Sequence, residues 1–446
     1  MEITNKLSGA AMNKGSGSYK TYIVSLMQVC SLLCVALLLP RFFFNQSKIF
    51  AKKISYQSEQ TFKLGIENLS SQFIKSLQGN SKDHYTVGVI TNHTGVDQKG
   101  KRTIDILLSK GLPVKKILVP EDDFIAYKKG VNWQMFDEQT HLPIALLPHI
   151  DSLKKSKEYN FTGIDVIFFD LQDTGICPNT YLLTLAKTLQ SACTQHKTVV
   201  VLDRPNLLGS SMEGMITQTA QIDNGLISLP MRHGMTLGEL AQHFNKHICT
   251  KAARLFVVPM HHYTRSLFAE DSHTLHGNLL TSIDAYYGSS FLTILNNVSP
   301  FDVGVGTDMA FACLALPDSL HFPKQKWFEL RTILKQQGIE TSWCRYMNPK
   351  RNTAYSGLRL LVRNMDTFSP FNAITTIIQF FNEAGLQLTF MPEFDRTFGG
   401  KKMRDFLEGR SSRHDLEYEV NRDLKNFYNK AQSSFIYKPV PKIVLL

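Results

Sequence analysis

Carboxylates placed directly after apolar runs are the residues of this sequence that could do chemistry. The run KKILVPEDD (115–123) ends in Glu121, Asp122 and Asp123. Three more carboxylates follow later apolar runs: Asp170, Asp173 and Asp203. Hydrolysis of a glycosidic bond typically uses two carboxyl groups, one of which donates a proton to the leaving oxygen. Repulsion from the two following aspartates would help Glu121 to keep such a proton.

The same residues also fit a structural interpretation. A proline followed by acids is a favourable start for a helix, because carboxylates are stabilised at the positive end of the helix dipole. Asp203 and Arg204, in the run LDRPN (202–206), could likewise form an internal ion pair that holds their loop. The sequence leaves both interpretations open at this point.

Other catalytic and binding motifs are missing from the sequence. GVGT (304–307) is too short for a dinucleotide fingerprint, and neither a G-x-x-x-x-G-K-[ST] phosphate loop nor a G-x-S-x-G elbow occurs. His243 and His247 lie four residues apart, but no Glu lies between them in zincin fashion and no third ligand is evident. We interpret the two histidines as part of a solvated helix face. We therefore expect neither a metal nor a cofactor.

The elements that would position the carboxylates follow from the apolar runs. Five runs end in polar or glycine-rich segments: YTVGVITNHTG, VKKILVPEDD, LPIALLPH, IDVIFFDLQDTG and TVVVLDRPNLLG. Runs of four to six residues rich in Val and Ile are typical of strands buried on both faces of a parallel sheet. Helix-like segments lie between them, most clearly at 179–196 and 236–248. This alternation predicts a doubly wound α/β domain over residues 62–255.

The polar segments that end these runs predict where a ligand would bind. In an open parallel sheet, ligands bind beyond the carboxyl ends of the strands. The segments TNHTG, PEDD, DLQDTG and DRPN all fall at such ends. We therefore expect the four loops to converge on one edge of the sheet and Glu121 to belong to a site there.

Residues 256–446 differ in character and predict a smaller α+β domain. The stretch 276–311 looks irregular, and strand-like SGLRLLVRN (356–364) and helix-like NAITTIIQFFNEAG (372–385) follow it. A charged, helical segment over residues 401–432 comes near the end of the chain.

The composition is that of a folded, basic protein. The 446 residues are enough for two domains, and 43% hydrophobic and 20% charged residues are ordinary for the globular class. The formal net charge is +11, but lysines and arginines are scattered among acids and form no basic-aromatic patch, so we expect no nucleic-acid partner. Five widely spaced cysteines without a C-x-x-C pair predict buried thiols rather than disulfides: Cys177, Cys193, Cys249, Cys313 and Cys344.

The N-terminal segment predicts attachment to a membrane. Residues 22–39 (YIVSLMQVCSLLCVALLL) carry no charge over about the shortest length that spans a bilayer as a helix. Lysines precede the run, as in an export signal, and no A-x-A-like cleavage site follows it. We expect residues 1–44 to hold a cytoplasmic tail and an anchor or signal, and residues 45–61 to be a linker. The folded domains would lie outside the cytoplasm, and they would be exported if the segment is cleaved.

Several motifs, taken together and in order, resemble the NamZ family of exo-β-N-acetylmuramidases. The resemblance covers roughly residues 62–440 and rests on ITNHTG (90–95), VPEDD (119–123), FDLQDTGICPNTY (169–181), LDRPNLLGS (202–210), PMRHGMTLGELA (230–241) and FDRTFGGKKMRDFLEG (394–409). Members of this family are exported or periplasmic glycosidases that release N-acetylmuramic acid from the non-reducing end of peptidoglycan fragments. The resemblance implies a Rossmann-like domain followed by a smaller C-terminal domain, with the active cleft between them.

The resemblance also implies roles for individual residues. Glu121 matches the proposed catalytic glutamate of the family, and we expect Asp173 to be the second catalytic carboxylate. Together with polar neighbours in the same loops, the candidates for binding substrate are Asn92, Asp122, Gln172, Tyr181, Asp203, Arg204, Asn206, Arg232 and His233. The implied partner is a peptidoglycan-derived glycan, and the N-terminal helix would bind the membrane.

The sequence departs from the family pattern at three places. The family's His and Gly after the glutamate are Asp122 and Asp123 here, and its aromatic-rich GARFYTY is GICPNTY (175–181), which keeps only the final Tyr181. Where the family has a glutamate and two arginines, DVGVGTDMAF (302–311) has Val303, Val305 and Met309. Arginine suits a carboxylate because it forms two parallel hydrogen bonds with it. We therefore predict weaker binding of the anionic lactyl group than in members that keep both arginines. The alternative function is a catalytically weakened relative that binds glycans or serves as an envelope scaffold.

Overall fold

The ranges that the computed structural model describes begin at Phe62. They are 62–78, 85–121, 136–148, 158–222, 225–247, 249, 251–266, 282–398 and 400–446. The expected membrane segment, the linker and Asp122 lie outside these ranges. Within the described ranges, no helix combines the length and the apolar character needed to cross a bilayer.

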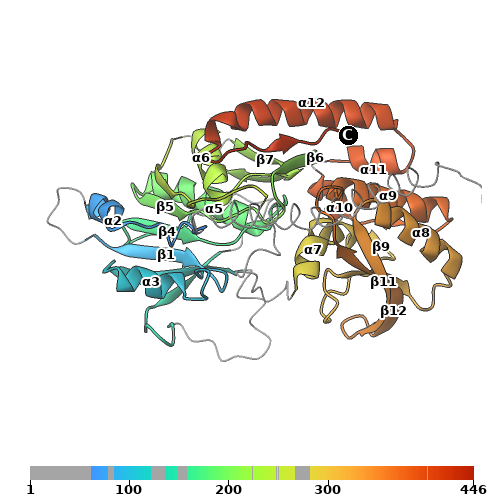
Figure 1. The fold of residues 1–446 in the computed structure, drawn as a ribbon, viewed down its shortest axis with the longest axis horizontal. Helices are drawn as coiled ribbons and strands as arrows, with labels where there is room; N and C mark the ends of the chain where they lie inside the picture. The colour runs from blue at the N-terminus through green and yellow to red at the C-terminus, as the bar shows by residue number, and fades with distance from the viewer. Residues whose placement is uncertain are drawn as a thin grey trace, which may run out of the picture. The chain divides into compact units, whose positions relative to one another are not determined.

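A six-stranded parallel sheet forms the centre of the N-terminal half (Figure 1). Its strands are β1 (Val87–Thr91), β2 (Val114–Pro120), β3 (Ile144–Leu147), β4 (Val166–Asp170), β5 (Thr198–Leu202) and β8 (Arg254–Val258). All residues of β1 and β4 are buried, as expected for strands covered on both faces. The order β3-β2-β1-β4-β5-β8 reverses direction between β1 and β4, as in a Rossmann-like fold, which confirms the predicted α/β class.

Helices cover both faces of this sheet (Figure 1). They are α2 (Ser71–Gln78), α3 (Thr103–Ser109), α5 (Thr180–Thr194) and α6 (Leu237–His247). Alternate strand residues point to opposite faces, so Val89 packs in the cluster that contains α2 and α3, and Ile90 packs with α5 and α6. The helices predicted at 179–196 and 236–248 are confirmed as α5 and α6.

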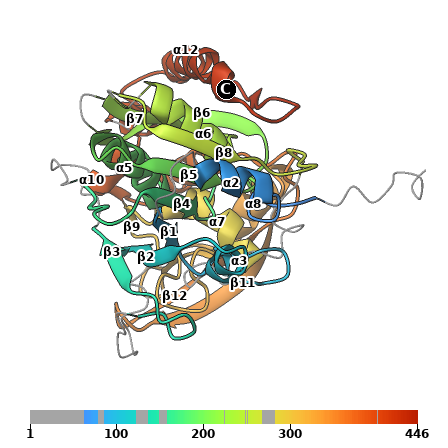
Figure 2. The same ribbon diagram turned by 90° about the vertical axis from the view of Figure 1, so that its left-hand side faces the viewer.

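A long hairpin joins the N-terminal half to the end of the chain. It consists of β6 (Ser211–Ile222) and β7 (Gly225–Arg232), and β14 (Lys442–Ile443) pairs in parallel with β6. Helix α12 (Arg413–Ala431) lies over β6 and β7 (Figure 2). The last part of the chain therefore packs on the first half. Residues Phe62–Leu446 form one compact unit, and the domain boundary at residues 255 and 256 stays a prediction.

The C-terminal half is built around a three-stranded antiparallel sheet in the order β10-β12-β11. These strands are β10 (Cys313–Pro317), β11 (Ile339–Asn348) and β12 (Thr353–Val362). The other elements are α7 (Ile283–Leu295), β9 (Val298–Ser299), α8 (Lys324–Gln336), α9 (Pro370–Glu383), β13 (Thr389–Phe390), α10 (Pro392–Thr397) and α11 (Lys402–Leu407). This mixture confirms the smaller α+β part.

Helix α7 corrects the prediction that 276–311 is irregular. The side chain of Ser282 caps the helix by accepting a hydrogen bond from the backbone N–H of Ala285 at 3.1 Å. Most residues of α7 are buried, including Tyr287 and Phe291. Apolar residues therefore surround the helix, and no one-sided pattern marks it in the sequence.

The cysteines outside the N-terminal segment are thiols, as predicted. Cys177, Cys313 and Cys344 are buried, Cys193 and Cys249 are partly buried, and none of the five forms a disulfide. The fold is therefore held by its apolar clusters and its hydrogen bonds within the described part of the chain.

Candidate active site

The candidate site lies at the carboxyl edge of the six-stranded sheet, where β1 and β4 are neighbours. Their register pairs Thr91 with Asp170, so Asn92 and the loop that starts at Leu171 leave the sheet side by side. Strand β2 is the other neighbour of β1 and ends one residue before Glu121. The direction of the strands thus brings the predicted loops to one edge, at the point where ligands bind in folds of this type.

Asn92 links the loop after β1 to the loop after β4 and the start of α5. Its side-chain oxygen accepts hydrogen bonds from the backbone N–H and the hydroxyl of Thr94, at 2.8 and 2.6 Å. Its Nδ2 donates to the hydroxyl of Tyr181, at the start of α5, at 2.9 Å. The Thr94 hydroxyl oxygen in turn accepts from the backbone N–H of Gln172 at 3.0 Å. Asn92, Tyr181 and Gln172 therefore form one network, with Asn92 and Tyr181 half-buried.

Gln172 is buried and ties the loop after β4 to the loop after β5. Its Nε2 donates to the carbonyl oxygens of Asp173 and Pro205, at 3.0 and 2.9 Å. Both protons of the amide are used in this way. These two bonds fix the position of the side-chain oxygen, which is buried.

Asp173 and His233 form a buried pair in the same network. His233 Nε2 lies 3.0 Å from Asp173 Oδ2, although the N–H is not aligned for a hydrogen bond. His233 Nδ1 accepts from the backbone N–H of Met235 at 3.3 Å, so the ring proton belongs on Nε2, next to the carboxylate. Asp173 Oδ2 also accepts from the N–H of Gly175 at 2.8 Å. These contacts hold the carboxylate and the imidazole in a fixed orientation.

Arg204 pairs with Asp170 and not with its neighbour Asp203, so the internal ion pair considered from the sequence is wrong. Arg204 Nε and Nη2 donate to the two oxygens of Asp170 in a bidentate pair that is almost fully buried. Arg204 Nη2 also donates to the carbonyl of Val96 at 2.9 Å, and the Thr103 hydroxyl donates to Asp170. Arg204 thus fixes the ends of β4 and β5 and the loop after β1.

Asp203 is fully buried and accepts four hydrogen bonds. Its Oδ1 accepts from the backbone N–H groups of Arg204 and Gly238, at 2.9 and 2.7 Å. Its Oδ2 accepts from the hydroxyls of Thr236 and Tyr437, at 2.8 and 2.6 Å. Burial raises the pKa of Asp203 to about 6, although the hydrogen bonds oppose this shift. The side chain joins β5, the start of α6 and the end of the chain.

Asn206 and Arg232 are also buried and bond within the fold, although Arg232 Nε has no hydrogen-bond partner among the described residues. Asn206 Nδ2 donates to the carbonyl of Met235 at 3.0 Å, and its Oδ1 accepts from the N–H of Leu208 at 3.0 Å. Arg232, at the end of β7, donates to the carbonyls of Leu208 and Phe368. These bonds connect the loop after β5, the hairpin and the C-terminal half.

Glu213 lies opposite Arg232 on the hairpin, with 3.8 Å between its Oε1 and Arg232 Nη1. Burial raises the pKa of Glu213, and the Arg232 charge opposes the shift. Burial likewise lowers the pKa of Arg232, opposed by Glu213. Both side chains are almost fully buried, so each charge depends on the other for compensation.

Gln172 Oε1, Asp173 Oδ1 and Arg204 Nη1 are three of the buried polar atoms at this edge that have no hydrogen-bond partner among the described residues. Buried polar groups in folded proteins are nearly always paired, so an unpaired one calls for a ligand or a bound water. Two of these atoms are acceptors and one is a donor. The edge can therefore bind a ligand that carries both hydroxyl or amide donors and an acceptor oxygen.

Glu121 follows the last residue of β2 and is half-buried. Its place at the end of β2 agrees with the position predicted from the sequence, beside the loop that carries Asn92. The next residue, Asp122, which was predicted to bind substrate, lies outside the described residues. The catalytic role of Glu121 stays a prediction.

The segment 302–311 places its apolar side chains partly in the core. Val303 is fully buried, and Val305 is half-buried against the main apolar cluster. Asp302 is the polar anchor of the segment: it accepts from Tyr346 at 2.5 Å and from Asn348 Nδ2 at 3.0 Å. A charged residue at Val303 would be costly here, whereas Val305 has room for one because it is half-exposed.

The histidines four residues apart on α6 are not a solvated face, which corrects that interpretation. His243 is buried, with its ring 4.9 Å from the ring of His247 and 5.2 Å from that of Phe427 on α12. Burial lowers the pKa of His243 to about 3. The sequence could not show this, because α12 covers the helix from nearly two hundred residues away. Within the described residues, no three His, Cys, Asp or Glu side chains are placed to hold a metal ion.

Two tyrosines that were not predicted from the sequence bond to the two aspartates Asp173 and Asp203. Tyr286, on α7, donates from its hydroxyl to the carbonyl of Asp173 at 3.2 Å. Tyr437, near the end of the chain, donates to Asp203. The pair YY at 286–287 follows a serine cap, which is the signal that could have placed this helix.

The fold and this network define a class of protein: a Rossmann-like domain with buried carboxylates at its ligand-binding edge and a smaller α+β part. The sequence matches the family described as "Exo-beta-N-acetylmuramidase NamZ, N-terminal" over residues 87–278, and its C-terminal counterpart over residues 287–437. The chain therefore belongs to the NamZ family, whose described activity is that of a peptidoglycan glycosidase.

Particular relatives agree with this membership. The peptidoglycan β-N-acetylmuramidase NamZ of Bacillus subtilis (strain 168) is 26% identical over 390 residues, which cover 84% of this chain and 91% of the relative. Two crystal structures of DUF1343 family proteins from Bacteroides fragilis share the fold, with TM-scores of 0.67 and 0.59 at 24% and 20% identity. Each match covers 84% of this chain and 99% of the other chain. At such identities these two structures bear on the fold alone.

Proposed function

We propose that this protein hydrolyses glycosidic bonds in peptidoglycan fragments and releases N-acetylmuramic acid or a related amino sugar. Membership of the NamZ family supports the peptidoglycan glycosidase class. The similarity to the Bacillus subtilis β-N-acetylmuramidase, over most of both chains, supports the choice of sugar. The role that follows is in turnover of the cell wall.

The observation that carries the proposal is the buried pair of Asp173 and His233. A carboxylate 3.0 Å from an imidazole nitrogen, with its second oxygen unpaired among the described residues, can accept a proton from water or stabilise positive charge on a sugar ring. Glu121, at the end of β2, is the general acid in this proposal and donates its proton to the leaving oxygen. His233 orients Asp173 and does not itself touch the substrate.

The other predicted site residues divide into two groups. Asn92, Gln172 and Tyr181 would contact the sugar, because their polar side chains face the same loops as Asp173. Asp203, Arg204, Asn206 and Arg232 would act by positioning those loops, since they are buried and bonded within the fold, and Arg204 would also offer Nη1 to the ligand. Asp122 stays a candidate for substrate binding.

The test is hydrolysis of a chromogenic β-N-acetylmuraminide by the full chain, with the corresponding β-N-acetylglucosaminide as a parallel substrate. We expect release of the chromophore from the first substrate and its loss in Glu121→Gln. Asp366→Ala serves as the control, because Asp366 is exposed and belongs to none of the loops at the strand ends. Absence of hydrolysis with either substrate would contradict the enzymatic proposal.

The second candidate is a glycan-binding relative with weakened catalysis. It is favoured by the apolar side chains of 302–311, where the resemblance to the family would place a glutamate and two arginines. In that case the muraminide would bind to the full chain without being cleaved. Calorimetry with N-acetylmuramic acid separates the two candidates, since it detects binding in the absence of turnover.

We also propose that residues 22–39 anchor the protein in a membrane, with the folded part outside the cytoplasm. The uncharged run supports the anchor, and peptidoglycan as substrate supports the compartment. Separation of membranes from soluble material in cells that make the full chain tests the anchor. Accessibility of the folded part to a protease added outside the cytoplasm tests its orientation.

A further inference from the structure

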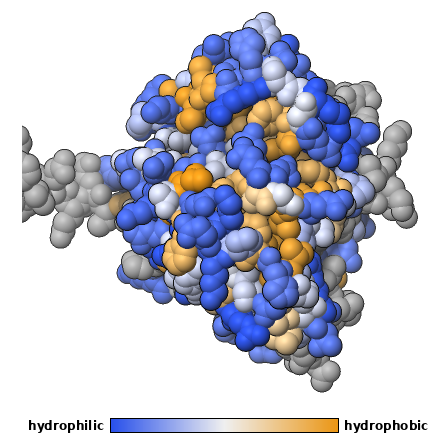
Figure 3. Space-filling view, turned by 90° about the vertical axis from the view of Figure 1, so that its right-hand side faces the viewer, coloured by the Kyte–Doolittle hydropathy of each residue, from blue (hydrophilic) through white to orange (hydrophobic). Residues whose placement is uncertain are grey.

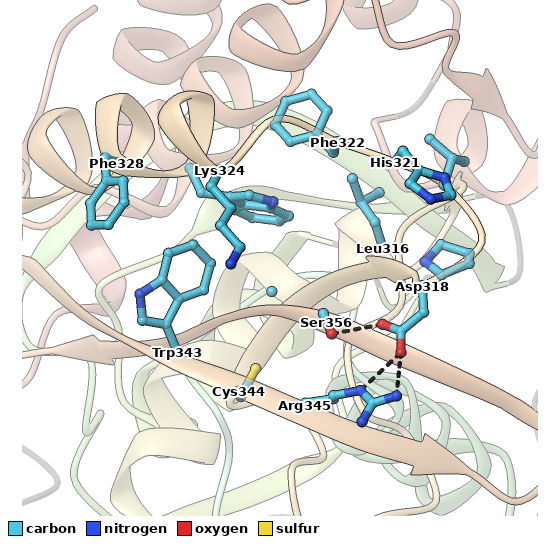
Figure 4. Close-up of a pocket in the computed structure, with 14 residues that line it drawn as sticks. Leu316, Asp318, His321, Phe322, Lys324, Phe328, Trp343, Cys344, Arg345 and Ser356 are labelled. Carbon is cyan, nitrogen blue, oxygen red and sulfur yellow. Dashed lines mark hydrogen bonds and ion pairs between the residues drawn. The ribbon is translucent and has the colours of Figure 1, made fainter.

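A groove in the C-terminal half lies apart from the strand-end network. It has a volume of about 650 Å³, within the range of small-molecule sites. Its floor is a row across the sheet formed by Leu316 on β10, Ser356 on β12 and Arg345 on β11, which lie opposite one another. The first turn of α8 and the loop before it form a wall beside this floor (Figure 4). We call it the Trp343 groove.

Aromatic rings line one side of the Trp343 groove. Trp343 and Phe328 are 47% and 46% exposed, which is unusual for such large apolar side chains. Their rings lie 5.6 Å apart and nearly perpendicular, at 82°. The buried ring of Trp327 supports Trp343 from below, with 6.4 Å between centroids. Packing thus holds both exposed rings in place rather than leaving them to move separately.

Polar groups line the opposite side. Asp318 accepts from the hydroxyl of Ser356 at 2.6 Å and from Arg345 Nε and Nη2 at 2.9 Å each (Figure 4). The Ser356 hydroxyl and the Arg345 guanidinium lower the pKa of Asp318, so it is ionised near neutral pH. Arg345 remains largely exposed and keeps donors for a ligand.

Lys324 gives the groove a positive charge. It lies in the first turn of α8, and Figure 4 shows its side chain extending into the groove towards Trp343. No carboxylate lies within ion-pair distance of Lys324 in the described part of the chain, while the charges of Arg345 and Asp318 cancel one another. The groove therefore carries an uncompensated ammonium group beside two exposed rings.

We propose that the Trp343 groove binds an N-acetylhexosamine unit of a glycan chain that carries a carboxylate. The C–H face of a sugar ring is apolar and weakly positive, so it packs on the negative face of Trp343, with Phe328 against the edge of the sugar. The hydroxyl and amide groups at the edge of the ring match the polar wall of Asp318, Ser356 and Arg345. The carboxylate pairs with Lys324. This combination is found in muramic acid.

Other classes of ligand match the groove less well. A purely apolar protein surface would bury the ammonium of Lys324 without a counter-ion, which is costly. A nucleic acid would require more than one uncompensated cation, because its affinity comes from several phosphate contacts. Apolar surface gathers on the side of the molecule that carries α8 and β11 and is interrupted by hydrophilic residues (Figure 3). That mixture suits a ligand with one apolar face and a polar rim.

The inference shares its sugar class with the proposed function but uses no residue of the reacting site. A chain bound in the Trp343 groove would be tethered to the enzyme while its end is processed, which raises the effective concentration of that end. Groove variants should therefore affect long glycans and leave small chromogenic substrates unchanged. This difference keeps the failure of one proposal distinguishable from the failure of the other.

The experiment titrates the full chain with a tetrasaccharide of alternating N-acetylglucosamine and N-acetylmuramic acid without stem peptides. The probe has N-acetylglucosamine at its non-reducing end, so an enzyme that removes terminal N-acetylmuramic acid does not consume it. We expect binding by calorimetry and a change in tryptophan fluorescence. Trp343→Ala should weaken binding by at least about tenfold, since a stacked ring loses its contact area.

Two further variants make the test specific. Met347→Ala is the matched control, because Met347 lies on the same strand, is 57% exposed and does not line the groove. Its affinity should equal that of the wild type. Lys324→Gln should weaken binding of the muramic probe but not of an N-acetylglucosamine tetramer, which has no carboxylate.

Three outcomes would overturn the proposal. The first is no binding of the tetrasaccharide at millimolar concentration, and the second is equal affinity of wild type and Trp343→Ala. The third is binding of a stem peptide alone that depends on Trp343 as strongly as binding of the sugar does, which would assign the groove to peptides. Hydrolysis of the small chromogenic substrate is measured on the same samples and reports separately on the proposed function.

Discussion

Asp173 and Asp203 follow neighbouring strands of one sheet, and both are buried, yet their surroundings differ. Asp203 accepts four hydrogen bonds from groups of the fold. Asp173 has a histidine beside one oxygen, and its other oxygen has no hydrogen-bond partner among the described residues. Burial and residue type therefore do not separate a candidate catalytic carboxylate from a structural one. What distinguishes the two carboxylates is the number of hydrogen bonds that each accepts from groups of the fold.

The reason for the difference lies in what each loop meets. The loop after β5 packs against the start of α6 and the segment around Tyr437, which supply hydroxyl and N–H donors. The loop after β4 lies at the reversal of strand order, where the loops after β1 and β4 lead away in different directions. Fewer fold groups therefore reach Asp173 than reach Asp203.

The largest expected effect concerns stability, through Asp203→Ala. The change leaves two backbone N–H groups and two hydroxyls buried without an acceptor, and each such group costs about 1–3 kcal/mol. We expect the free energy of unfolding to fall by at least about 3 kcal/mol, measured by urea denaturation. Asp366→Ala is the control, because Asp366 is exposed, and it should change the midpoint little. An Asp203→Ala protein with an unchanged free energy of unfolding would contradict the structural role of Asp203.

The next effect concerns activity, through Glu121→Gln. The amide keeps the size of the side chain but cannot donate the proton, so hydrolysis of the chromogenic muraminide should fall at least about 100-fold. The urea midpoint should stay close to that of the wild type, because Glu121 is half-buried. A variant that keeps more than about a third of the wild-type rate would remove Glu121 from the mechanism.

These expectations show how much of the molecule the sequence could predict. Strands, their burial and the edge where their loops meet follow from apolar runs and from the chain direction, both local properties. The partners of Asp203, Arg232 and His243 come from Tyr437, Phe368 and Phe427, which are distant in the chain. The hairpin β6–β7 was not predicted from the sequence either. It packs against the C-terminal helix α12, which is distant in the chain. A sequence motif thus places such residues at an edge but does not say which of them the fold uses.

A third prediction tests whether the apolar residues of 302–311 weaken the binding of the sugar carboxylate. Val305→Arg restores a cation at a half-exposed position where the resemblance to the family would place an arginine. A charge-assisted bond to a carboxylate contributes about 1.5–3 kcal/mol, so the affinity for N-acetylmuramic acid should rise at least about tenfold. Calorimetry with N-acetylglucosamine, which lacks the carboxylate, is the control and should show no gain. An unchanged affinity for both sugars would place this segment away from the anion.

The smallest effect concerns pH. Because the pKa of folded Asp203 is raised from 3.8 to about 6, the folded state holds this proton more tightly than the unfolded state does. The associated stability is fully present below about pH 4 and is lost as the pH rises through about 6, with a change of about 1 kcal/mol between pH 5 and pH 6. Asp203→Asn does not titrate, so the difference in unfolding free energy between wild type and this variant should change by that amount. A difference that is constant over this pH range would contradict the assignment.

The most direct test of the comparison measures two isosteric variants, Asp173→Asn and Asp203→Asn, in the same two assays. Asp173→Asn should lose at least about 100-fold in the rate of muraminide hydrolysis and keep its urea midpoint, because the amide retains the bond from Gly175 but not the charge. Asp203→Asn should lower the urea midpoint, since its amide meets the hydroxyl donors of Thr236 and Tyr437, and it should keep most of the rate. If the two variants lose rate and stability in equal measure, or if only Asp203→Asn loses rate, the distinction between the two carboxylates is wrong.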